Sequence, residues 1–144
     1  MRRFGLEAAS LIVDAALAEA RRRDLAPLAV AVLDAGGHLV AFKREDRAGI
    51  LRFDIAFAKA WGALGMGFGT RELANRSATF VNALAVMSGG RVAPSPGGVL
   101  VAGDEGEIVG AIGISGDKGE MDEACAVAGI VAAGFTAHTG IPEA

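Results

Sequence analysis

The sequence predicts an α+β fold, in which an antiparallel sheet of about four or five strands is flanked by α-helices. The first observation is a pair of short apolar segments on either side of a glycine-containing turn, which occurs twice, at residues 28–42 and 98–114. This pattern is typical of a β-hairpin. The second observation is that apolar residues recur every three or four positions in segments before, between and after the hairpins, which indicates helices. Strands joined by tight turns need no crossover helix, so we expect the sheet to be antiparallel.

The length and composition of the chain predict one globular domain. Its 144 residues are close to the usual size of a single folding unit, so we expect residues 1–144 to form one domain. A hydrophobic content of 52% with only 22% charged residues excludes a disordered chain. The single cysteine, Cys125, has no partner for an internal disulfide and indicates a reducing compartment, so we expect a cytoplasmic protein.

The distribution of charge argues against two classes of partner. With 14 basic and 17 acidic residues the net charge is −3, which does not support the basic surface of a nucleic-acid-binding protein. Residues 124–141 lack charged side chains over the length of a membrane span, but their alanine, glycine and threonine content favours a buried helix or a subunit contact. Glu7 and Asp14 interrupt the apolar run that a signal peptide needs. We therefore expect neither nucleic-acid nor membrane binding.

The first helix is expected to begin at Leu6, because Leu6 and Ala9 open an apolar stripe that continues at helical spacing. The three arginines at residues 21–23 fall in its last turn, where cations stabilise the negative end of the helix dipole; a phosphate or carboxylate site is the alternative. Residues 28–33 and 38–42 then predict two strands around a turn that contains two glycines.

The middle of the chain predicts two helices and a loop. Residues 50–64 contain no proline and a single glycine near their end, and their aromatic and aliphatic side chains recur at helical spacing. A second helix is expected to begin at Thr70, a capping residue, and to run towards Met87. Residues 88–98 are rich in glycine and proline and predict a loop.

The second hairpin comprises residues 98–102 and 107–114, joined by a turn with a glycine at each end. A last helix is expected to begin near Glu120 to Asp122, whose carboxylates suit a helix N-terminus, and to end near Ala133. The predicted order of elements is therefore α-β-β-α-α-β-β-α.

Familiar catalytic and nucleotide-binding motifs do not fit the sequence. Gly65 and Gly67 have the spacing of the first two glycines of a dinucleotide-binding motif. Thr70 stands where the third glycine of that motif would be, and no predicted strand precedes the segment. Ser115 and Lys118 form a Ser-x-x-Lys pair, but the partner motifs of such enzymes are absent, so a turn explains them. Neither paired cysteines nor a His-Glu-x-x-His motif occurs, so we expect no zinc site.

Three turns at predicted strand ends stand out: residues 44–46 carry charged side chains, residues 96–98 are proline and glycine, and residues 115–118 combine a glycine with polar side chains. Glycine lets the backbone approach a ligand closely and presents free amide groups to an anion. Each segment by itself is explained as a tight turn. If the three turns meet at one edge of the sheet, they form a pocket for a small organic ligand, and this is our site hypothesis.

Several segments, taken in order, resemble the GlcG/HbpS family, which includes haem-binding HbpS-like proteins and the C-terminal domain of PduO-type proteins. The resemblance spans about residues 6–135 and is carried by residues 34–46, 58–60, 96–99, 109–116 and 122–123. It implies a profilin-like antiparallel sheet flanked by helices, usually assembled into homo-oligomers. Several members of the family bind haem, and others accompany corrinoid or small-acid metabolism without a settled activity.

The family pattern is carried over position by position. It covers Gly36, Gly37, Arg44, Asp46, Lys59, Pro96, Gly97, Gly98, Gly113, Ser115, Gly116, Asp122 and Glu123. One departure concerns the expected pocket: the family has Arg-x-Asp-Gly-Ala where this chain has Arg-Glu-Asp-Arg-Ala, so Arg47 replaces a glycine. Arg47 would either add a contact for an anion or close the site to a flat tetrapyrrole.

We therefore expect an accessory protein that binds a small organic ligand, and the resemblance makes haem or another tetrapyrrole the first hypothesis for that ligand. The predicted ligand-binding residues are Arg44, Asp46, Arg47, Lys59, Arg91, Pro96, Gly97, Gly98, Ser115, Gly116 and Asp117. Haem iron needs an axial donor such as His, Cys, Met or Tyr. The chain has no Tyr, and His38 and His138 are the candidates, with a structural role as the alternative for each.

Two other functions remain open. A lysine buried on a helix can lose its proton and act as a base or form an imine. Lys59 is the candidate, with Asp46 or Asp117 holding it or sharing proton transfer and an arginine clamping a substrate carboxylate. Such a site suits a cofactor-independent isomerase, hydratase or lyase, whereas an ion pair is the structural explanation of Lys59. The third hypothesis is a structural or assembly subunit without catalysis.

Overall fold

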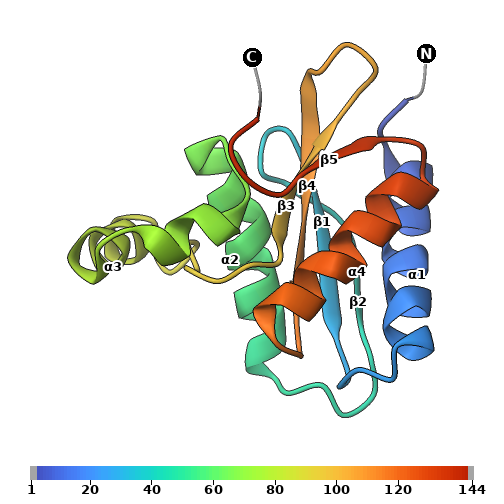
Figure 1. The fold of residues 1–144 in the computed structure, drawn as a ribbon, viewed down its shortest axis with the longest axis horizontal. Coiled ribbons are helices and arrows are strands. Elements are labelled where there is room, and N and C mark those ends of the chain that lie inside the picture. The colour runs from blue at the N-terminus through green and yellow to red at the C-terminus, as the bar shows by residue number, and fades with distance from the viewer. Residues whose placement is uncertain (1–2, 143–144) are drawn as a thin grey trace.

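A five-stranded antiparallel sheet forms the centre of the protein, with the strand order β2-β1-β4-β3-β5 (Figure 1). The computed structural model describes residues 3–142. The strands are β1 (Ala29–Asp34), β2 (Leu39–Arg44), β3 (Gly98–Ala102), β4 (Ile108–Ser115) and β5 (Thr136–His138). Each neighbouring pair of strands is antiparallel, which confirms the predicted α+β fold and both of its hairpins.

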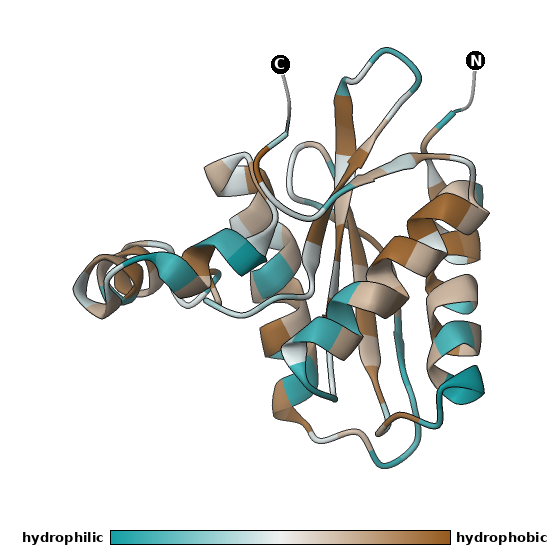
Figure 2. Cartoon of the chain, viewed as in Figure 1, coloured by the Kyte–Doolittle hydropathy of each residue, from teal (hydrophilic) through white to brown (hydrophobic). Residues whose placement is uncertain are grey.

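Helices cover both faces of this sheet. On one face α1 (Leu6–Arg22) packs beside α4 (Gly119–Ala132), and α2 (Leu51–Met66) covers the other face (Figure 1). Successive residues of a strand point to opposite faces, so a strand that is apolar throughout serves both layers. In β1, Val32 packs with α1 and α4 while Leu33 packs against α2. Figure 2 shows the resulting concentration of hydrophobic residues along the central strands.

Two glycines allow α2 to lie directly on the sheet. A Cβ atom on Gly113 of β4 would overlap the carbonyl oxygen of Ala56, and a Cβ atom on Gly98 of β3 would overlap that of Lys59. The backbone of α2 therefore occupies the space that side chains would fill in an ordinary helix-sheet contact. This close approach places the side chain of Lys59 in the interior.

The segment after α2 differs from the sequence prediction of one helix running from Thr70 towards Met87. It forms a short 3-10 helix, η1 (Thr70–Asn75), and a separate α-helix, α3 (Ala78–Met87). Ser77 starts α3 as an N-cap, because its side-chain oxygen accepts a hydrogen bond from the Phe80 backbone N–H. The prediction was wrong here because it took Thr70 as the capping residue of a single helix. The Thr70 hydroxyl instead donates a hydrogen bond to the Ser95 carbonyl oxygen and accepts one from the Gly98 N–H.

The uncharged stretch at residues 124–141 is divided between α4 and β5. The short strand β5 pairs with β3 and forms one edge of the sheet. Within residues 3–142, no helix combines the length and the apolar character needed to cross a membrane.

Candidate functional site

Segments that precede β1 and β3 and follow β2 and β4 meet at the end of the sheet drawn at the bottom of Figure 1. Arg44, Ala29 and Ser115 are in register across β2, β1 and β4, so the two turns that begin after Arg44 and after Ser115 leave the sheet at the same end. The loop before β3 joins them, because the Ile114 N–H donates a hydrogen bond of 3.1 Å to the Gly97 carbonyl oxygen. All three turns singled out in the sequence are therefore at one end of the molecule.

A pocket of about 390 Å³ opens at this end, and we call it the strand-end pocket. Its lining consists of Arg21, Pro27, Arg44, Glu45, Asp46 and Arg47. Three cationic and two anionic side chains surround it, so the lining carries a net positive charge. Glu45 is already engaged by the protein, since one of its oxygens lies 3.0 Å from Arg21 Nε and the other accepts a 2.8 Å hydrogen bond from the Leu28 N–H.

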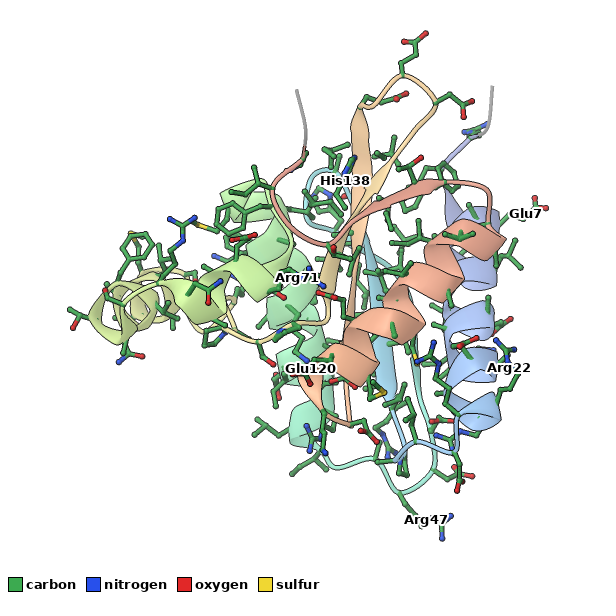
Figure 3. All side chains as sticks on the ribbon, in the orientation of Figure 1. Glu7, Arg22, Arg47, Arg71, Glu120 and His138 are labelled. Atoms are coloured by element: carbon green, nitrogen blue, oxygen red, sulfur yellow. The ribbon has the colours of Figure 1, made fainter. Side chains whose placement is uncertain are left out.

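The two arginines that follow β2 are held differently. Arg44 donates one hydrogen bond of 2.8 Å to the Ala48 carbonyl oxygen, which fixes its guanidinium beside the pocket. Arg47 makes no hydrogen bond or ion pair with any residue between 3 and 142, and its side chain extends from this end of the protein (Figure 3). Its backbone has φ 71°, a left-handed conformation that costs a non-glycine residue roughly 1–2 kcal/mol. The chain thus keeps an unpaired cation at a position where glycine would be the easier choice.

Lys59 lies beneath this end in a buried ion pair. Its Nζ donates hydrogen bonds to the Ile114 carbonyl oxygen (2.7 Å) and to Asp122 Oδ2 (3.1 Å), and both charged residues are at most 2% exposed. Burial lowers the pKa of Lys59, although the Asp122 carboxylate opposes this shift. Burial likewise raises the pKa of Asp122 against the effect of the Lys59 ammonium. The carboxylate that holds Lys59 is therefore Asp122, rather than Asp46 or Asp117.

Several other predicted site residues shape this end without lining the pocket. Ser115 is fully buried and its Oγ accepts a 3.0 Å hydrogen bond from Arg52. Gly97 has φ 127° and leaves no room for a side chain beside Lys59 Nζ. Asp117 accepts a 2.8 Å hydrogen bond from the Ala26 N–H, and this bond is the main cause of the lowered pKa of Asp117. Pro96, Gly98 and Gly116 complete the turns around them.

Three predicted residues lie elsewhere. Arg91 stacks over the ring of Trp61 at 4.0 Å, in a different pocket between α2 and α3. His38 is in the turn between β1 and β2, at the other end of these strands from Arg44, and its Nδ1 lies 3.1 Å from Asp34 Oδ1. His138 is in β5 at the edge of the sheet (Figure 3). Among residues 3–142, no three His, Cys, Asp or Glu side chains are grouped to hold a metal ion.

Sequence reasoning did not select all the residues that matter at this end. Arg21 was explained by the helix dipole; it lines the pocket, and its guanidinium is engaged by Glu45 and by the Leu25 and Ala26 carbonyl oxygens. Asp122 matched the family pattern but was explained only by the N-terminus of the last helix, and Arg52 carried no signal at all. Their roles depend on contacts with residues more than 60 positions away, Arg52 with Ser115 and Asp122 with Lys59, which spacing along the chain does not reveal.

A comparison with family models decides the relationship. The model described as "Haem degrading protein HbpS-like" matches residues 4–131. The chain belongs to the HbpS-like family. This confirms the resemblance found in the sequence motifs. A comparison with curated protein sequences found no match.

Solved structures similar to this HbpS-like protein cover nearly the whole chain. The structure described as a PduOC:heme complex superposes with a TM-score of 0.85 at 27% identity, over 95% of this chain and 99% of that one. Klebsiella pneumoniae protein ORFY gives 0.79 at 26% identity, over 92% and 94% of the two chains. A double mutant of Streptomyces reticuli HbpS gives 0.76 at 31% identity, over 91% and 87%.

Proposed function

We propose that this HbpS-like protein is an accessory protein that binds a small organic anion in the strand-end pocket, with haem or another tetrapyrrole as the first identity to test. The observation that carries the proposal is the cluster of Arg21, Arg44 and Arg47 around one pocket. The similarity to a PduOC:heme complex over 95% of the chain supports a tetrapyrrole as the ligand.

The arginines of the strand-end pocket fit the carboxylate groups of such a ligand. A guanidinium binds a carboxylate through two parallel hydrogen bonds, and this geometry favours Arg over Lys at such sites. Arg44 uses one guanidinium nitrogen for the Ala48 carbonyl and keeps the others for a ligand. Arg47 keeps all of its donors. Arg44 and Arg47 could therefore each bind one of two carboxylates on the same ligand.

The strand-end pocket does not fit haem iron equally well. None of its lining residues is a His, Cys, Met or Tyr, the side chains that serve as axial donors. Cys125 is fully buried, and burial raises the pKa of its thiol to about 11, which keeps the thiol protonated. The proposal is therefore that recognition rests on the carboxylates of the ligand and not on a bond from His38 or His138 to iron.

Two titrations test the proposal. The purified protein is titrated with hemin, followed by absorption, and with iron-free protoporphyrin, followed by fluorescence. We expect both to saturate stoichiometrically. Arg47→Ala should weaken both by about tenfold, because it removes a charged hydrogen-bond partner without breaking a protein contact. His38→Ala should change neither titration.

Arg3→Ala is the matched control, because Arg3 is also exposed but lies before α1, far from Arg21 at the other end of that helix. A featureless titration without saturation would remove the tetrapyrrole hypothesis. Equal affinities for the Arg47→Ala and Arg3→Ala variants would place the ligand outside the strand-end pocket.

The enzymatic hypothesis has less support from the geometry. A catalytic base must come within hydrogen-bond distance of its substrate. Lys59 is not among the residues that line the strand-end pocket, and its side chain is 3% exposed. We therefore do not propose catalysis at Lys59.

The cytoplasmic location remains a prediction.

A further inference from the structure

A second pocket, of about 240 Å³, lies between α2 and α3, and we call it the pocket beside Trp61. Arg91 is the only charged residue of its lining, so no carboxylate is present to pair with that arginine. The volume is below the roughly 300–1,000 Å³ of pockets for drug-sized molecules, so the pocket suits a ligand of about ten non-hydrogen atoms. Its walls are the apolar side chains of Trp61, Met66, Leu84, Met87 and Val92.

Two glycines of α2 keep this pocket open. A Cβ atom on Gly62 would lie 3.5 Å from the Val92 Cα, and a Cβ atom on Gly65 would lie 3.7 Å from the Trp61 ring. Both are ordinary contact distances, so the rest of the chain leaves room for alanine at each position. Glycine inside a helix is less stable than alanine, because it loses more conformational freedom on folding. The chain therefore keeps this space empty at the expense of its own stability.

Arg91 is held at the pocket with its terminal nitrogens unused. Its Nε donates a 2.6 Å hydrogen bond to the Ser88 carbonyl oxygen, and its Cζ lies 4.0 Å from the centre of the Trp61 ring. Its backbone N–H donates a further bond of 3.1 Å to Ser88 Oγ. The two terminal guanidinium nitrogens bond no residue between 3 and 142. A guanidinium fixed in this way loses little freedom on binding an anion, and its paired N–H groups match a carboxylate.

We propose that the pocket beside Trp61 binds a small monocarboxylate with an unbranched apolar chain, the chemistry of a medium-chain fatty acid. The carboxylate pairs with the terminal nitrogens of Arg91, and the chain lies against Met66, Leu84 and Met87. Methionine side chains adapt to a flexible apolar ligand. A ligand with two negative charges would place one of them against an apolar wall, whereas a neutral one would leave the guanidinium unused. The proposal does not depend on the ligand of the strand-end pocket.

Octanoate tests the proposal, because it has about ten non-hydrogen atoms and one carboxylate. It does not absorb light where tryptophan does, and Trp61 is the only tryptophan of the chain. We expect the fluorescence of Trp61 to change saturably with octanoate, and 1-octanol, its neutral counterpart, to bind about tenfold more weakly. Arg91→Met should weaken octanoate binding by about tenfold and leave the affinity for 1-octanol unchanged, since it removes the charge but keeps an apolar stem.

Arg76→Met is the matched control, because Arg76 also stacks over an aromatic ring, that of Phe68 at 5.2 Å, but does not line the pocket. Gly65→Leu is a second variant, which fills the pocket and leaves Arg91 in place. Binding of both ligands should disappear in this variant, while denaturant unfolding should show no loss of stability, because the added Cβ meets no close contact.

Three outcomes overturn the proposal. The first is a wild-type fluorescence that changes linearly with octanoate, without saturation. The second is an affinity for octanoate that Arg91→Met lowers no more than Arg76→Met does. The third is octanoate binding that survives Gly65→Leu, since the ligand would then lie outside the pocket beside Trp61.

Discussion

At the scale of single residues, the buried pair of Lys59 and Asp122 is the most demanding feature of the protein. Both charges are removed from water, and each is compensated by the other and by one further partner, the Ile114 carbonyl or the Asp117 N–H. A pair of this kind is costly to break because the remaining charge stays buried without a partner. It joins α2 to α4 at the end of the sheet where the strand-end pocket opens.

We expect Lys59→Met to lower the free energy of unfolding by about 3–5 kcal/mol, because Asp122 is then left as an unpaired buried carboxylate. Adding Asp122→Asn should recover more than half of that loss, since Asn keeps an acceptor for the Asp117 N–H but carries no charge. Denaturant unfolding measures both values.

Lys43→Met is the control for this prediction. Lys43 Nζ also lies 2.8 Å from a carboxylate, that of Asp14, but both side chains are more than half exposed. Its replacement should cost less than about 1 kcal/mol. Equal losses for the two lysines would mean that the Lys59 pair contributes no more than a surface ion pair.

The residue types of the candidate site were more predictable than their arrangement. Arg44, Asp46 and Arg47 were selected from one turn, and the structure brings them together in one pocket. Arg91 was selected for its charge alone and lies beside Trp61 instead. Neighbours in one turn stay close whatever the fold, whereas contacts between distant segments depend on packing that the spacing of residues does not encode.

At the scale of elements, the contact between α2 and the sheet depends on the glycines of β3 and β4. We expect Gly113→Ala to lower the free energy of unfolding by about 1–3 kcal/mol, because the added methyl group overlaps the Ala56 carbonyl and forces α2 away from β4. Gly49→Ala is the control, since no atom lies within 4 Å of the Cβ that it adds. A thermal or denaturant unfolding curve that is the same for both variants would contradict this account.

The elements with strong local signals were predicted well. The strand β3 and both hairpin turns follow from apolar segments around glycine-containing turns, and these signals need no tertiary information. The break between η1 and α3 and the short strand β5 were not resolved in the sequence. Ser77 competes with Thr70 as a helix start, and β5 has only three residues, whose strand conformation comes from pairing with β3.

At the scale of the whole molecule, the pocket beside Trp61 lies apart from the strand-end pocket. The strand-end pocket is built from the turn after β2 and the end of α1, whereas the pocket beside Trp61 begins near the C-terminus of α2. Arg91, which the sequence grouped with Arg44 and Arg47, therefore lies at a different site.

The two outer strands have a further consequence for the behaviour of the protein at high concentration. Strand β2 ends in Lys43 and Arg44, and β5 is only three residues long. A sheet edge with free backbone groups is a template for fibril growth, and charged side chains or short strands at the edge hinder it. We therefore expect that neither edge of the sheet readily pairs with the sheet of another molecule, even in concentrated solution.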